Sequence, residues 1–228
     1  TSAFFPDWSP TEMKLVYCTD KHQISSNGRR PQHLAVYDYQ TRKISKLTQG
    51  DVFDLNPDFS NDGKWIVYSS DEGSPEVFNL WKISVDGLQK EQLTNNLNLN
   101  PATTGNIALG RPSWSPDDQF IYFSVYRQKS QNGIYRISLQ NKTLEEVITS
   151  RWMDICPVAS PDHSKLAFIS KRSGNNQIWI YNLITGKYSQ ITGEENDHIS
   201  TDWGKLEWIG GNTLLFGEYS FESKNDAI

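Results

Sequence analysis

Apolar and turn-forming residues alternate along this chain in a phrase that recurs. Each copy has an anchor, an apolar residue two positions later, a turn of four residues and a second apolar run. The anchors lie 45 to 55 residues apart, at Pro6, Pro57, Pro112, Pro157 and, by alignment, Leu206. We therefore interpret the chain as four clear units and one decayed unit of a single repeat.

The turns and the runs after them predict paired strands. Four turns begin at Ser9, Ser60, Ser115 and Ser160, and the fifth reads Ile209-Gly210-Gly211-Asn212. Serine first, proline second and aspartate third favour a type I turn, because proline fixes its own φ and the polar side chains bond nearby backbone N–H groups. Two apolar columns follow, namely Leu15, Ile66, Ile121, Leu166 and Leu215, then Tyr17, Tyr68, Phe123 and Phe168. The column between them is apolar too, so both faces of this strand are predicted to be buried.

Two further strands complete each unit. A third apolar stretch follows a loop of variable length, and a fourth strand ends at Leu47-Thr48, Leu93-Thr94, Ile148-Thr149 or Ile191-Thr192. A small sheet with two apolar faces needs a layer on each side, and like sheets stacked around an axis provide both layers. The predicted fold is all-β, a β-propeller of four-stranded antiparallel blades. A β-helix is the alternative, but its repeats are shorter and lack this hairpin chemistry.

The phrase Pro-x-Trp-Ser-Pro-Asp, the aromatic strand and the terminal Leu-Thr resemble the repeat of the TolB-like β-propeller family, from about Pro6 to Phe216. The resemblance implies blades at about residues 4–50, 51–97, 98–150 and 151–193, with an incomplete one at 194–228. About four and a half blades would then form part of a six-bladed ring in a longer protein. The same repeat occurs in propellers of prolyl oligopeptidase and dipeptidyl peptidase relatives, so it does not fix the function. It favours a periplasmic or extracellular location.

The family pattern also singles out charged positions. It has an aspartate three residues before the anchor, which Asp54 and Asp154 match, while Ala3, Leu109 and Trp203 depart from it. It has an arginine near the end of the second strand, which Arg127 and Arg172 match, while Lys21 keeps only the charge and Glu72 reverses it. The two aspartates are the one candidate carboxylate pair at the channel. The alternative is that they bond loop N–H groups or a neighbouring arginine.

Composition narrows the range of partners. The 228 residues carry a formal net charge of −5 with both signs interspersed, so nucleic acid is not an expected partner. No apolar run approaches the roughly 20 residues that cross a bilayer, so no membrane insertion is expected. The first ten residues lack the features of a signal peptide, so the mature chain begins here or the chain is an excised piece. Cys18 and Cys156 lie in different units, and we interpret them as two buried thiols, with a disulfide as the alternative.

All the long insertions are predicted to share one face. By propeller connectivity, the loops between the second and third strands lie on the same side as the loops between blades, and binding usually resides in such loops. The candidate contacts for a protein or peptide partner are Arg29, Arg30, Arg127, Arg172, Trp152, Trp203, His198, Asp54 and Asp154. The alternative is a set of solvated loop tips joined by weak ion pairs.

The sequence contains no catalytic motif. It has no Gly-x-Ser-x-Gly elbow, and its four histidines occur singly. A metal pair of His22 and His198 across the channel is the less favoured reading, so no metal site and no cofactor are predicted. The predicted function is a non-enzymatic binding module for a protein or peptide. The alternatives are an accessory propeller that gates substrate access in a larger hydrolase or lyase, and a glycan-binding propeller.

Overall fold

The computed structural model describes residues 2–20, 28, 30–95, 108–126, 132–193 and 205–217. All the regular elements in these residues are β-strands, paired antiparallel in separate sheets. The predicted all-β propeller of four-stranded blades is confirmed, with four complete blades and one further hairpin. None of the described residues belongs to a helix long and apolar enough to cross a membrane.

The strands follow one another in order within each blade. Blade 1 contains β1 (Ala3–Trp8), β2 (Lys14–Thr19), β3 (His33–Asp38) and β4 (Lys43–Lys46). Blade 2 contains β5 (Asp54–Phe59), β6 (Trp65–Ser70), β7 (Asn79–Ser84) and β8 (Lys90–Gln92). Blade 3 contains β9 (Ala108–Leu109), β10 (Ser113–Trp114), β11 (Phe120–Tyr126), β12 (Asn132–Ser138) and β13 (Leu144–Ser150). Blade 4 contains β14 (Asp154–Ala159), β15 (Lys165–Ser170), β16 (Gln177–Asn182) and β17 (Tyr188–Gln190), and the fifth hairpin contains β18 (Glu207–Ile209) and β19 (Thr213–Leu215).

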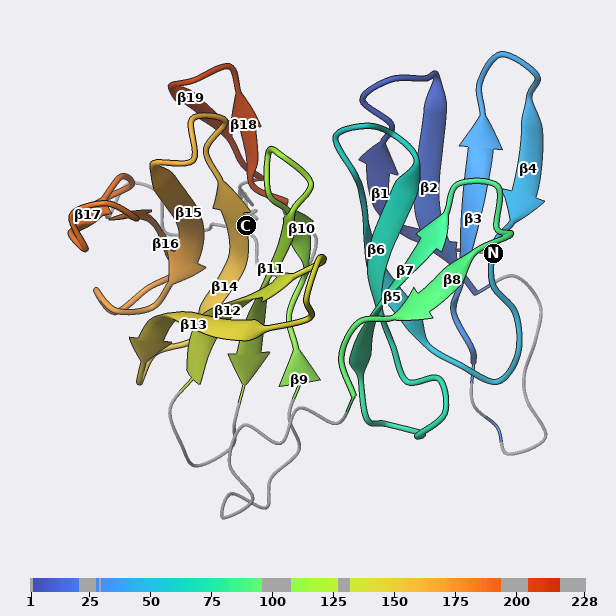
Figure 1. The fold of residues 1–228 in the computed structure, drawn as a ribbon, viewed down its shortest axis with the longest axis horizontal. Helices are drawn as coiled ribbons and strands as arrows, with labels where there is room; N and C mark the ends of the chain where they lie inside the picture. The colour runs from blue at the N-terminus through green and yellow to red at the C-terminus, as the bar shows by residue number, and fades with distance from the viewer. Residues whose placement is uncertain are drawn as a thin grey trace, which may run out of the picture.

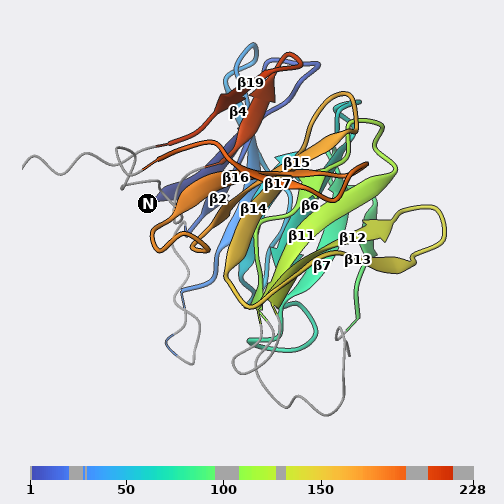
Figure 2. The same cartoon turned by 90° about the vertical axis from the view of Figure 1, so that its left-hand side faces the viewer.

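The blades pack face to face, with blades 1 and 2 on one side of Figure 1 and the others opposite. Figure 2 shows the same stack after a quarter turn. The preceding face of a blade is the one turned toward the blade before it in sequence, and the following face is the other. Blade 1 and blade 2 bury a shared core formed by Val16, Cys18, Leu34 and Val36 against Phe59, Ile66, Tyr68 and Ile83. Ile66, Val67 and Tyr68 are each 0% exposed, so both faces of β6 are buried as predicted.

Hydrogen bonds near the axis join each inner strand to the next. Asp7 accepts the backbone N–H of Phe59 at 2.7 Å, and Asp58 accepts that of Trp114 at 3.1 Å. The indole N–H of Trp114 also donates to the carbonyl of Asp58 at 2.9 Å. The residue after each anchor proline therefore links its blade to the following one.

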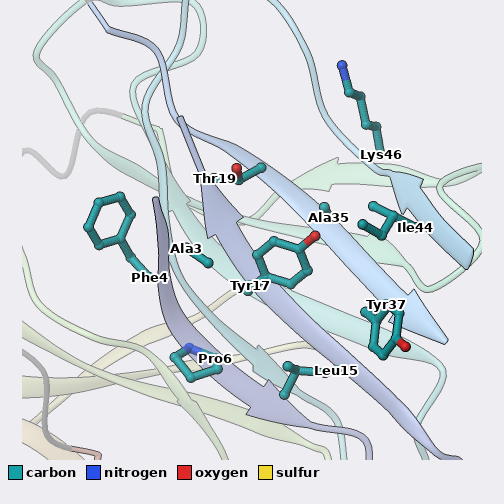
Figure 3. Close-up of a pocket in the computed structure, with 10 residues that line it drawn as sticks. All are labelled: Ala3, Phe4, Pro6, Leu15, Tyr17, Thr19, Ala35, Tyr37, Ile44 and Lys46. Carbon is teal, nitrogen blue, oxygen red and sulfur yellow. The ribbon is translucent and has the colours of Figure 1, made fainter. Parts of the chain in front are cut away.

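The preceding face of blade 1 is covered by no other described blade. Tyr17 pairs across the sheet with Ala35, where the other blades pair aromatic residues with Trp81, Tyr135 and Trp179. The missing ring leaves a groove of about 520 Å³, drawn in Figure 3. Its apolar lining includes Leu15, Tyr17, Tyr37 and Ile44. Tyr17 is therefore only half-buried, although Tyr68 in the same column is fully buried.

The fifth hairpin corrects one predicted register. The sequence alignment placed Leu215 in the column of Leu15, but Trp208 pairs with Leu214, as Trp8 pairs with Leu15. The turn in this hairpin is one residue shorter than in blade 1, so every later side chain changes face. Leu214 packs against blade 4, while Leu215 is 54% exposed.

Candidate functional site

Strand register places the long loops on one face of the propeller. Asp54 at the start of β5 pairs with Ser70 at the end of β6, which pairs with Asn79 at the start of β7. The same arrangement joins Asp154, Ser170 and Gln177 in blade 4. The loops after the second strand and the loops between blades therefore share a side, which we call the long-loop face.

In blade 4 the candidate residues Asp154 and Arg172 bind each other. The Arg172 guanidinium donates to Asp154 Oδ2 at 2.8 Å, and only 13% of the arginine side chain is exposed. The guanidinium carbon also lies 4.9, 5.2 and 4.3 Å from the ring centroids of Phe168, Trp179 and Tyr188. Burial raises the pKa of Asp154, and hydrogen bonding by Ser170 and the charge of Arg172 oppose that rise. Arg172 thus balances a buried carboxylate within the scaffold.

In blade 2 the equivalent Asp54 has a different environment. Its side chain is 1% exposed, and the imidazole of His33 from blade 1 faces it, with Nδ1 4.0 Å from Oδ2. Glu72 stands where blade 4 has Arg172, and it binds Lys90 at 2.7 Å instead. The two carboxylates at equivalent positions are therefore held in unlike ways, and each lies within its own blade rather than in a pair.

Two exposed apolar side chains lie in the loop before blade 4, on the long-loop face. Trp152 is 37% exposed and Met153 is 50% exposed, in the loop between β13 and β14. The Arg151 guanidinium carbon lies 4.6 Å from the Trp152 ring centroid, and the Trp152 backbone N–H donates to Ser150 Oγ at 3.0 Å. Arg30 is also exposed on this face. The other candidates, Arg29, Arg127, Trp203 and His198, lie outside the described residues, as does His22.

The axis contains a charged cluster that the sequence analysis missed. Lys205, just before the fifth hairpin, binds Asp7 of blade 1 at 2.5 Å and Asp58 of blade 2 at 2.6 Å. One ammonium thus serves two buried carboxylates, which leaves a net negative charge. Burial and repulsion by Asp58 raise the pKa of Asp7 to about 6, and the two aspartates raise the pKa of Lys205 despite its burial. The sequence does contain one signal of this cluster, because an aspartate directly follows the anchor proline in each of the first two units.

Three residues of the inner strands have a strained backbone, and both cysteines are buried. Phe5, Asn56 and Cys156, each directly before an anchor proline, have φ of 51°, 54° and 52° at bulges of the inner strands. Non-glycine residues seldom adopt this left-handed conformation. Cys18 and Cys156 are buried and form no disulfide, and burial raises the pKa of Cys18 to about 12. These thiols therefore pack as apolar groups.

The opposite face is made of tight turns that satisfy their own polar groups. Ser60, Ser115 and Ser160 donate to the aspartate two residues later, at 2.7, 2.6 and 2.6 Å. Asn61 of one turn donates its backbone N–H to Asp118 of the next at 2.8 Å. Within the described part of the chain, no three His, Cys, Asp or Glu residues group as a metal site.

Two family models match adjoining parts of the chain. The TolB β-propeller domain matches residues 103–209, and the dipeptidyl peptidase IV N-terminal region matches residues 19–108. The chain is 29% identical over 179 residues to the Tol-Pal system protein TolB of Francisella tularensis subsp. mediasiatica, covering 78% of this chain and 38% of that protein. It is 24% identical over 147 residues to a TolB homolog of Chlorobium luteolum, covering 63% of this chain and 30% of that protein.

A solved structure agrees in fold. TolB from Acinetobacter baumannii superposes with a TM-score of 0.67 at 20% identity, covering 94% of this chain and 51% of that one. The chain therefore spans about half of that structure and well under half of the curated relatives.

Proposed function

We propose that this chain, whose repeats are TolB-like β-propeller repeats, is a non-catalytic binding module that docks a protein or peptide partner on its long-loop face. The observation that carries the proposal is the contrast between the two faces. The opposite face is closed by turns whose serines and aspartates bind one another. The long-loop face presents Trp152 and Met153 with Arg151 stacked on the indole.

Side chains of this kind suit a docking surface. Tryptophan and arginine are enriched among the residues that contribute most to binding protein partners, and methionine adapts to irregular surfaces. The serines and aspartates of the opposite turns already have partners, so a ligand there would have to displace existing hydrogen bonds. Arg172 is assigned to the scaffold, while Arg30, Trp152 and the candidates outside the described residues remain proposed contacts.

Site-specific photo-crosslinking tests the proposal. A photoreactive phenylalanine analogue would replace Met153 on the long-loop face or Leu88, which is 83% exposed on a turn of the opposite face. In extracts of the cells that produce the protein, we expect a discrete crosslinked species from position 153 and none from position 88. Equal crosslinking from both positions, or a species from position 88 alone, would contradict the assignment of the face.

The match to the dipeptidyl peptidase IV N-terminal region supports a second candidate. In that case the propeller is an accessory unit of a larger hydrolase or lyase and controls access to a catalytic centre elsewhere. The gene sequence after Ile228 separates the two: an α/β-hydrolase segment there would favour the accessory role. Glycan binding is the third candidate, and it requires that Trp152 fluorescence respond to oligosaccharides.

A further inference from the structure

A group of buried polar side chains that lack hydrogen bonds lies where blade 1 meets blade 2. Both carboxylate oxygens of Asp54, both ring nitrogens of His33, the Gln32 amide oxygen and the Tyr68 hydroxyl have no hydrogen-bond partner among the residues that the structure describes. Asp54 and Tyr68 are each 0% exposed. Nearly all buried polar groups in native proteins are paired, so several unpaired ones at one place indicate a missing partner.

Blade 4 shows which partner the same position takes. Three positions form the same frame in both blades: the aspartate that begins the inner strand, the aromatic residue of the second strand and the tryptophan of the third. In blade 4 they are Asp154, Phe168 and Trp179. They are Asp54, Tyr68 and Trp81 in blade 2. In blade 4 the Arg172 guanidinium binds the aspartate and lies over both rings. In blade 2 the arginine is replaced by Glu72, and no guanidinium or ammonium of the described residues binds the Asp54 oxygens.

The unpaired oxygens favour a positive ligand. Both carboxylate oxygens of Asp54 and the Gln32 amide oxygen offer lone pairs, while the phenol, one imidazole nitrogen and the Trp81 indole N–H can donate. Burial and the charge of Asp54 raise the pKa of Tyr68, so that group stays neutral. The Lys90 ammonium of the same blade lies 5.2 Å from the Trp81 ring centroid, but it binds Glu72 at 2.7 Å and not Asp54.

We propose that Asp54 binds the guanidinium group of an arginine side chain from the docked partner, in the place that Arg172 takes in blade 4. The inference rests on the proposed function, because it names one residue of the partner that the long-loop face receives. We expect the guanidinium to enter past Glu72 and His33, whose side chains are 34% and 12% exposed.

A small probe tests this site without any knowledge of the partner. N-acetyl-argininamide would be titrated into the full chain while the ring resonances of His33 are followed by NMR, with N-acetyl-citrullinamide as the neutral control of matched shape. We expect the His33 signals to move with a Kd on the order of 1 mM for the arginine compound and not to move for the citrulline compound. Asp54→Asn should abolish the response.

Two variants at Glu72 separate binding from folding. Glu72→Arg supplies the arginine of blade 4 in blade 2, so it should raise the melting midpoint and abolish the response to the probe. Glu72→Gln loses the contact with Lys90 but supplies no cation, so it should retain the response. The proposal is wrong if His33 does not respond in the wild type, responds equally to citrulline, or still responds in Glu72→Arg.

The outcome is independent of the docking assignment. A probe response without crosslinking at position 153 would retain the cation site and reject the docking face. Crosslinking at position 153 without a probe response would retain the docking face and reject the cation site.

Discussion

Replacing Lys205 by methionine tests the charged cluster at the axis. The variant keeps most of the side-chain volume but removes the ammonium that binds Asp7 and Asp58. The two carboxylates, 9% and 5% exposed, would then face each other without a counter-charge. Removing one partner of a buried ion pair costs about 3–5 kcal/mol, and the lower end applies here because 27% of the Lys205 side chain is exposed. We therefore expect a loss of about 3 kcal/mol, or about 6–12 °C in the melting midpoint of a chain of this size.

The dependence on pH makes the test specific. In the wild type the pKa of Asp7 is raised from 3.8 to about 6, so the folded state binds this proton more tightly than the unfolded chain. That contribution to stability is complete below about pH 4 and is lost as the pH rises through about 6. Without Lys205 the pKa of Asp7 rises further, and protonation at pH 5 relieves the repulsion. Lys205→Met should therefore cost more at pH 8 than at pH 5.

Urea unfolding at the two pH values measures both effects. Asp7→Asn in the wild-type background should flatten the change of stability between pH 4 and pH 6, and combined with Lys205→Met it should restore part of the lost stability. A Lys205→Met midpoint within error of the wild type, or an equal loss at both pH values, would refute the axial role of this cluster.

Three other perturbations follow from the structure. Arg172→Met should lower stability by about 3 kcal/mol, because Asp154 would stay buried without the guanidinium that balances it. An unchanged urea midpoint would return Arg172 to the docking surface. Ellman's reagent at pH 8 should label Cys18 and Cys156 only as fast as the protein unfolds, since both thiols are buried and the pKa of Cys18 is about 12; prompt labelling would contradict this. The apolar groove of blade 1, which no described blade covers, should make the protein self-associate, and Ile44→Lys in that groove should reduce the self-association seen by sedimentation velocity. A wild type that stays monomeric at every concentration would contradict this prediction.

The repeated phrase was sufficient to predict the strands, because local alternation and turn chemistry act within a few residues. Tyr68, Phe123 and Phe168 are fully buried, as their column predicts. Tyr17 does not follow this prediction, because its burial depends on a neighbouring blade and the local pattern contains no information about that blade. Leu215 departs because a turn shortened by one residue leaves the same composition but reverses the faces.

The candidate site was predicted less completely, since its interactions connect distant parts of the chain. The pairing of Asp154 with Arg172 follows from two positions of one repeat, and the sequence analysis held it open as the alternative to a role at the channel. The Lys205 cluster joins residues 198 positions apart; Asp7 and Asp58 share one column of the repeat, but no column links them to Lys205. The sequence shows Glu72 as a charge reversal, but only the geometry shows that the Asp54 oxygens are left without a hydrogen-bond donor among the described residues.

The link from Lys205 to Asp7 also bears on the order in which the molecule assembles. Each blade is a meander of sequence neighbours, so its hairpins close over short loops and can form early. The axial link must wait until Lys205 has been synthesised, because it closes a loop between residues 198 positions apart. During translation blades 1 and 2 therefore emerge with their inner carboxylates unneutralised, and the arrival of Lys205 marks the step at which that repulsion is reduced.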